Sequence, residues 1–115
     1  NVSCTDSVWS VSKVHVTVYN PVASQTSNNG LITSCGDTIK VGQGLKWAAI
    51  SPDLYGVLDC GDNVIIICHD TRYHLKVFKI TDKTNKRIKN TIDILEDTIS
   101  DGKFVDCRII KLPKK

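Results

Sequence analysis

Apolar and polar residues alternate near the start of the chain. Within residues 11–19 every second position from 14 to 18 is a valine, and polar or aromatic residues lie between them. A period of two residues is typical of a strand with one buried face. Asn20-Pro21 ends this strand, because Pro disfavours its continuation and Asn tolerates turn geometry. The pattern therefore predicts a strand over residues 11–19.

Short apolar segments separated by turn signals fill most of the remaining chain. We predict strands at residues 31–34, 38–41, 64–68, 73–80 and 104–112. The apolar run 47–50 is broken by residues 51–54, which suit a capped turn or a single helical turn. Residues 94–101 are the one predicted helix, about two turns long and stopped by Gly102. Short strands with so little helix favour a small β-barrel, because closure removes exposed strand edges.

The length of 115 residues is that of one domain. We expect an N-terminal extension over residues 1–12, a barrel domain over 13–112 and a tail over 113–115. No apolar run approaches the ~20 residues of a membrane helix, so no membrane span is predicted. The net charge of +3 and the aromatic content of 6% are too small to indicate a nucleic-acid partner. We expect a monomer.

The cysteine content indicates an oxidising compartment. Five cysteines allow up to two disulfides with one thiol left over, and their pairing stays open: Cys4, Cys35, Cys60, Cys68 and Cys107. Their spacing has no zinc signature, so we expect neither a metal nor a cofactor. A chain that begins at Asn1 and contains no Met fits a mature form whose signal segment has been removed. We therefore expect a secreted, periplasmic or cell-envelope protein.

Two carboxylates stand beside predicted strands near the middle of the chain. Asp82 follows the strand at 73–80, and Asp93 lies between Ile92 and Ile94. From the residues alone, Asp82 reads as a turn former and Asp93 as a buried residue that ties down a loop. A catalytic pair is the competing interpretation.

Several short motifs occur in a set order: Val-Thr-Val-Tyr-Asn-Pro (16–21), Gln-Thr (25–26), Leu-Ile-Thr (31–33), Ala-Ala-Ile-Ser-Pro-Asp-Leu (48–54), Gly-Asp-Asn-Val (61–64), Asp82 and Ile-Asp-Ile (92–94). This order resembles the double-psi β-barrel proteins over roughly residues 13–112. Within them it is most similar to the rare-lipoprotein-A-like and three-aspartate domains. Those domains share their barrel with the catalytic part of membrane-bound lytic transglycosylase A.

The resemblance implies a six-stranded double-psi β-barrel, mainly β with one or two short helices, and a shallow groove. It implies that Asp82 is the catalytic acid with Asp93 beside it, and that Asp53 loosely matches the first family aspartate. Tyr19, Gln25 and Thr26 would then bind substrate at the rim of the groove, with Asp53 as a further substrate-binding residue. Two departures stand out. The family often has Asp-Thr-Gly where this chain has Asp-Lys-Thr (82–84), and Gln-Thr-Asp where it has Gln-Thr-Ser (25–27).

The chemistry implied by the resemblance is cleavage of a glycosidic bond in peptidoglycan or a related glycan. In a lytic transglycosylase a hydroxyl of the substrate attacks its own anomeric carbon, so one carboxyl can serve first as acid and then as base. That carboxyl must be protonated near neutral pH, which requires burial or a nearby like charge. Two non-enzymatic alternatives remain: a carbohydrate-binding module on the same barrel, or a secreted interaction or virion protein that uses the barrel as a scaffold.

Overall fold

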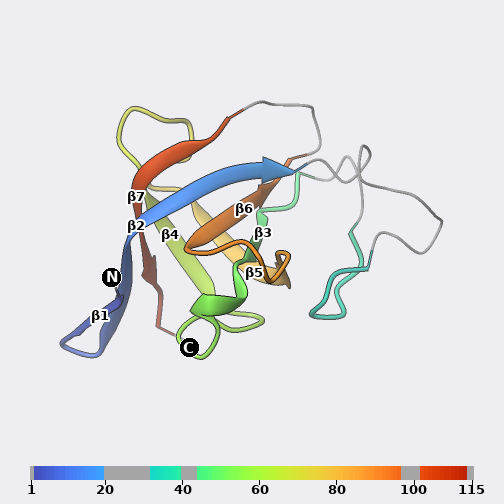
Figure 1. The fold of residues 1–115 in the computed structure, drawn as a ribbon, viewed down its shortest axis with the longest axis horizontal. Helices are drawn as coiled ribbons and strands as arrows, with labels where there is room; N and C mark the ends of the chain where they lie inside the picture. The colour runs from blue at the N-terminus through green and yellow to red at the C-terminus, as the bar shows by residue number, and fades with distance from the viewer. Residues whose placement is uncertain (1, 20–31, 40–43, 97–101, 114–115) are drawn as a thin grey trace.

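The structure is a computed structural model that describes residues 2–19, 32–39, 44–96 and 102–113. Its elements are β1 (Val2–Thr5), β2 (Val8–Tyr19), β3 (Trp47–Ile50), the short 3-10 turn η1 (Pro52–Leu54), β4 (Asn63–Ile67), β5 (Val77–Lys83), β6 (Thr91–Leu95) and β7 (Phe104–Lys111) (Figure 1). The protein is mainly β. Among the described residues η1 is the only helical element.

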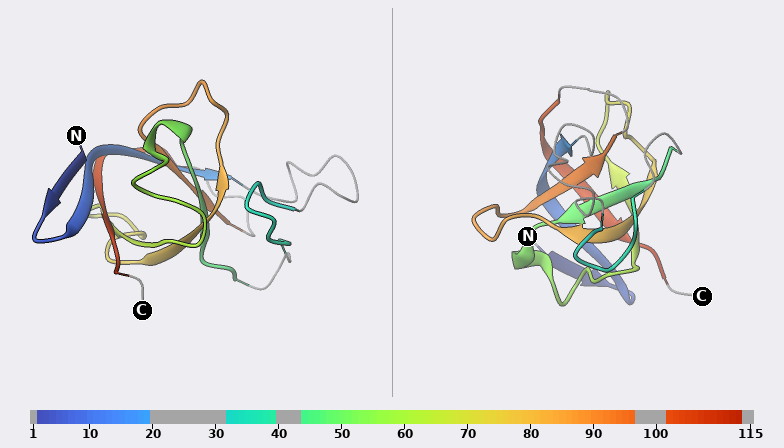
Figure 2. Two further views of the ribbon diagram at one scale, coloured as in Figure 1. Left: turned by 90° about the horizontal axis from the view of Figure 1, so that it is seen from below. Right: turned by 90° about the vertical axis from the view of Figure 1, so that its right-hand side faces the viewer.

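Six of the strands close into a mixed barrel. Around the barrel the order is β2, β6, β3, β5, β4 and β7, and β7 pairs with β2 to complete the ring. The pairs β2–β6 and β3–β5 are parallel, whereas the other four pairs of the ring are antiparallel. The two further views show these strands wrapped around a common interior (Figure 2). This confirms the closed six-stranded barrel that the sequence predicts.

The strand pairing has an internal two-fold symmetry. If β2, β3 and β4 are exchanged with β5, β6 and β7, each parallel pair maps onto the other and every antiparallel neighbour is kept. The antiparallel pair β3–β6 lies on the symmetry axis between the two parallel pairs. Two interlocked halves of this kind are compatible with a double-psi barrel.

The core is built from inward-facing residues of all six barrel strands. Its members alternate along the strands, as the period of two requires, and these are fully buried: Val14, Val16, Ala48, Ile50, Val64, Ile66, Ile80, Ile92, Ile94 and Ile109. The predicted valine face of β2 is confirmed, with Val18 partly buried against the same core. Leu54 and Leu58, which follow β3, belong to the same buried cluster.

The N-terminal residues form a hairpin that the sequence did not predict. β2 begins at Val8 instead of residue 11, and β1 pairs with it antiparallel from Val2↔Val11 to Thr5↔Val8. Asp6 and Ser7 make the turn with φ of 53° and 66°, a conformation that a two-residue hairpin loop requires and that lacks its usual glycine here. The hairpin projects from the barrel (Figure 2), and every residue of β1 is exposed.

The helix predicted for residues 94–101 is wrong at its start. Ile94 and Leu95 belong to β6, and the Glu96 N–H continues the ladder by donating to the Tyr19 carbonyl at 2.9 Å. Ile92 and Ile94 alternate into the core, so a strand period explains the apolar run better than a helical one. Residues 97–101 lie outside the described part of the chain.

Other strand predictions are confirmed with shifted boundaries. The strand predicted at 73–80 begins only at Val77, because residues 73–76 form a turn in which the Lys76 N–H donates to the Tyr73 carbonyl. The strand predicted at 64–68 is β4, which lies one residue earlier, at Asn63–Ile67. The strand predicted at 104–112 is β7, which ends one residue earlier, at Lys111. Of the predicted strands at 31–34 and 38–41, the structure describes a single bridge between Ile32 and Thr38. The turn after β3 is confirmed as η1.

Two disulfides link distant parts of the chain. Cys35 bonds to Cys60 and Cys68 bonds to Cys107, while Cys4 is a free and exposed thiol. This confirms the expected two bridges with one thiol left over. Two disulfides are compatible with a secreted or extracytoplasmic protein. In the part of the chain that the structure describes, we find no helix long and apolar enough to cross a membrane.

Candidate functional site

Two of the predicted aspartates lie in one row that crosses four strands. Asp82 of β5 is the register partner of Ala49 of β3, Ala49 is the partner of Asp93 of β6, and Asp93 is the partner of Thr17 of β2. Side chains of directly paired residues stand on the same face of a sheet. Their sequence neighbours Ala48 and Ile92 point into the core, so the row faces outward.

A β-bulge in β5 gives Asp82 its outward position. Ile80 pairs with Ala48 but Asp82 pairs with Ala49, so Thr81 is an extra residue on β5. Without the bulge, Asp82 would face the same side as Ile80, which is buried in the core. Bulges commonly redirect a side chain in this way. The small side chain of Ala49 is then all that separates the two carboxylates along the row.

Asp93 is the partly buried acid of the row. The Thr17 hydroxyl donates a hydrogen bond of 2.6 Å to Asp93 Oδ1. Burial raises the pKa of Asp93, the Thr17 hydrogen bond lowers it, and the charge of Asp82 raises it, with a net increase above the ordinary value. The two carboxylates therefore interact electrostatically, and the proton is held more firmly on Asp93 than on an exposed aspartate.

Asp82 is tied to a distant segment by hydrogen bonds. The backbone N–H of Ser34 and that of Lys83 each donate to Asp82 Oδ1 at 2.9 Å, and the Ser34 hydroxyl donates to the same oxygen. The neighbouring Cys35 donates from its N–H to the Thr81 carbonyl at 3.2 Å and is bridged to Cys60. Asp82 thus anchors the segment around residues 32–39 against the bulge of β5.

Two tyrosines share the electrostatic environment of these acids. Burial raises the pKa of Tyr19, with further contributions from Asp82 and Asp93, and its buried hydroxyl has no hydrogen-bond partner in the described residues. Burial also raises the pKa of Tyr55, followed by the charges of Asp59 and Asp82. Tyr55 lies beneath Lys83, whose Nζ is 4.1 Å from the ring centre. Tyr19 thus lies within electrostatic range of Asp82 and Asp93, and Tyr55 lies within range of Asp82.

The other predicted site residues do not join this group by any described contact. Both oxygens of Asp53 accept the Asn90 N–H at 3.1 and 3.2 Å, so Asp53 holds the turn that precedes β6. Gln25 and Thr26 lie outside the described residues. Sequence reasoning missed Ser34 and Tyr55. It also missed Thr17, although Thr17 alternates with Tyr19 on the polar face of β2 and could have been found from that pattern.

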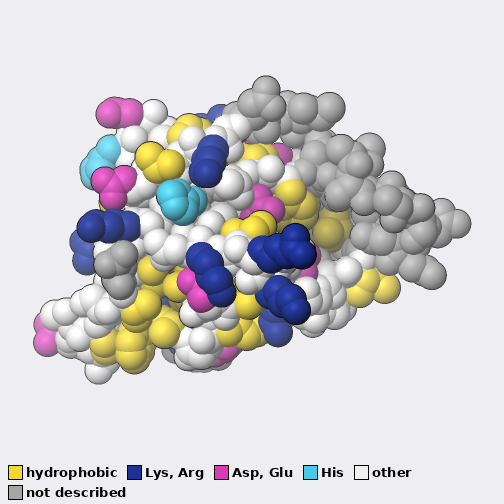
Figure 3. Space-filling view, in the orientation of Figure 1, with side chains coloured by type: hydrophobic (Ala, Val, Ile, Leu, Met, Phe, Trp, Pro, Cys, Tyr) yellow, Lys and Arg dark blue, Asp and Glu magenta, His cyan; other side chains and the backbone are white. Residues whose placement is uncertain are grey.

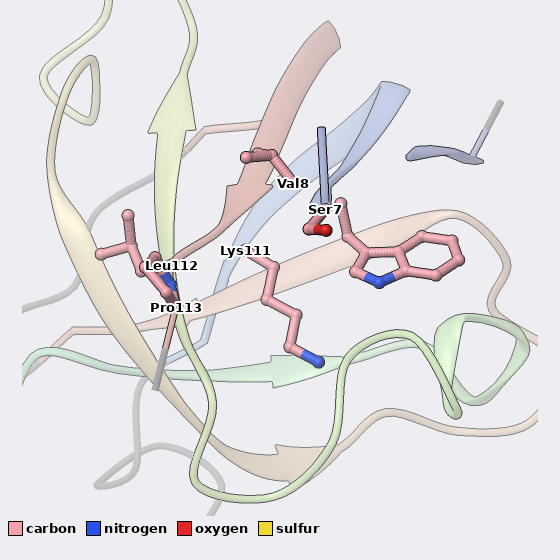
Figure 4. A pocket seen from close by; sticks show the side chains of 6 residues that line it. Ser7, Val8, Lys111, Leu112 and Pro113 are labelled. Carbon is pink, nitrogen blue, oxygen red and sulfur yellow. The ribbon is translucent and has the colours of Figure 1, made fainter. Parts of the chain in front are cut away.

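A cavity lies at the other end of β2. It has a volume of about 330 Å³ and is lined by Ser7, Val8, Trp9, Lys111, Leu112 and Pro113 (Figure 4). The Lys111 ammonium pairs with the buried Asp62 carboxylate at 3.5 Å. None of the predicted site residues lines this cavity. In the described segments, no group of three or more His, Cys, Asp or Glu residues could hold a metal ion.

Comparisons with known proteins do not extend this picture. No family model, curated protein or solved structure matches the chain. The fold is therefore defined by its own strand pairing, and the candidate site by the row of Asp82, Ala49, Asp93 and Thr17 with the two tyrosines.

Proposed function

We propose that the protein is a glycan-directed, lytic-transglycosylase-like enzyme related to the rare-lipoprotein-A-like and three-aspartate barrels, and that it acts on peptidoglycan or a similar polymer outside the cytoplasm. The observation that carries the proposal is the electrostatic pair of Asp82 and Asp93 on the outer face of the barrel, in which the pKa of Asp93 is raised. A carboxyl that keeps its proton to higher pH is what acid catalysis at a glycosidic oxygen requires.

The environments of the two acids favour Asp93 as the proton donor, whereas the family resemblance assigned that role to Asp82. Burial and the charge of Asp82 both raise the pKa of Asp93. Asp82 is the acceptor of the Ser34 and Lys83 donors, all of which bond to its Oδ1. When two carboxylates differ in this way, the more buried one is suited to donate and its neighbour to keep it protonated.

In this mechanism Asp93 protonates the oxygen of the bond that breaks. A hydroxyl of the same sugar then attacks the anomeric carbon, and the Asp93 carboxylate takes up the proton which that hydroxyl releases. No water is consumed, so the product is an anhydro-sugar and Asp93 returns to its protonated form. The Tyr19 hydroxyl is buried, lies within electrostatic range of both acids, and has no hydrogen-bond partner among the described residues.

Digestion of purified peptidoglycan tests this proposal. We expect wild-type protein to release anhydro-sugar products detectable by mass spectrometry. Loss of a general acid typically costs ~10²–10⁴ in rate, and we expect Asp93→Asn to show a loss of that order. Asp106→Asn is the matched control, because Asp106 is exposed on β7 and removes the same charge away from the row. Activity unchanged in Asp93→Asn would contradict the mechanism.

A second function is favoured by one observation. The hydrogen bonds that hold Asp82 to Ser34 give that carboxylate a structural task, which suits a binding module that has kept the barrel without the reaction. Sedimentation with insoluble peptidoglycan, with no soluble fragment released, would select this alternative. Failure to bind any glycan would exclude both functions.

A further inference from the structure

The turn between β5 and β6 carries a concentrated positive charge. We call residues 83–89 the basic turn, and its cationic side chains are Lys83, Lys86, Arg87 and Lys89. All are exposed, and no Asp or Glu occurs from residue 83 to 92. Figure 3 shows Lys and Arg side chains gathered over this turn. The ion pair found in the described chain joins Lys111 to Asp62, so these four cations have no carboxylate partner there.

Hydrogen bonds hold the backbone of the basic turn in place. The Asn85 side chain accepts the Arg87 N–H at 2.9 Å, and the Asn85 carbonyl accepts the Ile88 N–H at 2.9 Å. At one end of the turn, the Thr84 N–H donates to the Ile50 carbonyl. At the other end, the Asn90 N–H donates to the Asp53 carboxylate. The cations are therefore displayed on a defined loop, which lowers the entropic cost of binding an anion there.

The basic turn is also directly connected to the candidate site. It joins the two strands that carry the acids, since Asp82 immediately precedes Lys83 and Asp93 follows two residues after Thr91 opens β6. Lys83, the first residue of the basic turn, directly follows Asp82 and has its ammonium over the Tyr55 ring. A chain lying along this side of the barrel would meet cations and carboxylates in succession.

We propose that the basic turn binds anionic groups of a glycan, carboxylates or phosphates, and so selects a negatively charged polymer as the ligand of this protein. The inference rests on the proposed function for what the site then does to the glycan, but the binding itself does not depend on catalysis. Complementary charge attracts such a chain and orients it, most strongly at low salt.

The surroundings of the turn favour a glycan over a nucleic acid. Asp53 and Asp82 flank the turn, and a polymer with a charge on every unit would bring anions against these carboxylates. A glycan with spaced charges can place neutral rings beside the acids and its anionic groups on the cations. The Lys83 ammonium lies 4.1 Å from the centre of the Tyr55 ring, so one face of this ring is already occupied and is not open to stacking by a base.

Binding of defined oligosaccharides by titration calorimetry tests the proposal. The protein is used as Asp93→Asn, so that no cleavage occurs and failure of the catalytic mechanism leaves the measurement intact. The probes are an oligouronate for carboxylates, a phosphodiester-linked glycan for phosphates, a neutral dextran oligosaccharide, and single-stranded DNA of equal charge. We expect at least one anionic glycan to bind, the dextran not to bind, and affinity to fall as salt is raised.

Charge-reversal variants test whether anionic-glycan binding depends on the basic turn or on the net charge of the protein. Lys86→Glu with Lys89→Glu should weaken anionic-glycan binding at least tenfold. The control, Lys76→Glu with Lys103→Glu, makes the same net change at exposed residues outside the turn and should leave binding within twofold. Circular dichroism checks that both variants fold. Equal weakening by both pairs, dextran binding as tight as the charged probes, or DNA binding as tight as the glycans would each overturn the proposal.

Discussion

Asp93 shows how single contacts set the protonation of the candidate site. Burial and the Asp82 charge raise its pKa above the ordinary 3.8, and the Thr17 hydrogen bond opposes them. Because the folded pKa is raised, the folded state binds this proton more tightly than the unfolded chain does. The stability linked to Asp93 is therefore fully present below about pH 3.8 and is lost as the pH rises through the folded pKa.

The contacts of Asp93 predict opposite shifts in two variants. Asp82→Asn removes a like charge, so the pKa of Asp93 should fall towards its ordinary value. Thr17→Val removes a hydrogen bond to the carboxylate, so the pKa should rise further. Carboxyl carbon NMR titration of Asp93 measures both midpoints. Asp106→Asn should leave the midpoint unchanged, and shifts of the same sign in the first two variants would rule out this account.

At the scale of elements, the segment around residues 32–39 depends on covalent and polar ties to the barrel. It has one β-bridge of its own, between Ile32 and Thr38. It is anchored to the barrel by the Cys35–Cys60 disulfide and by the Cys35 N–H, which donates to the Thr81 carbonyl. Ser34 adds its hydrogen bonds to Asp82 and accepts the Lys83 N–H on its hydroxyl at 3.2 Å. The disulfide therefore helps to keep Ser34 against Asp82.

Replacing Cys35 and Cys60 together by Ser should destabilise the protein. The bridge closes a loop with a sequence separation of 25 residues. The chain-entropy model gives a loss of about 3.5 kcal/mol for a loop of this size. Denaturant unfolding without reductant measures the change in the free energy of unfolding. Cys4→Ser is the control, since Cys4 is free and exposed and its loss should matter by less than about 0.5 kcal/mol.

Features of the fold that depend on neighbouring residues could be predicted from the sequence, whereas features that depend on distant pairing could not. The alternating valines of β2 and the Ser51-Pro52 break after β3 act through neighbouring residues, so both were predicted. The hairpin turn at Asp6 and Ser7 has positive φ without glycine, so it left no clear signal. The bulge at Thr81 appears only when β5 is paired with β3.

The candidate site also has residues that the sequence indicated and partners that only the structure shows. Tyr19, Asp82 and Asp93 were chosen through a family resemblance, and they share one electrostatic environment in the structure. The partners that define this environment come from far along the chain: Ser34 is 48 residues from Asp82, and Thr17 is 76 residues from Asp93. The outward position of Thr17 could be read from its alternation with Tyr19, but no pattern in a single sequence reports which distant residues pair, so the contacts of Ser34 and Thr17 with the two acids were found only in three dimensions.

At the scale of the whole molecule, β7 is the strand that closes the barrel. It pairs with β2 on one side and with β4 on the other, and its Cys107 is bridged to Cys68 just beyond β4. The ring therefore joins strands near the two ends of the described chain. Because such contacts are distant in sequence, closure is expected to be a late and cooperative step in folding.

Ile109 provides the test of this closure. It is fully buried, pairs with Val11 of β2 and Ile66 of β4, and so contributes to both seams. Ile109→Ala should cost about 2–5 kcal/mol, because it removes buried methyl groups and leaves a cavity. Val105→Ala on the same strand is the matched control: Val105 is 60% exposed, and its truncation should cost less than about 0.5 kcal/mol. Guanidinium unfolding of both variants measures the difference, and equal losses would mean that the C-terminal strand does not seal the barrel as described.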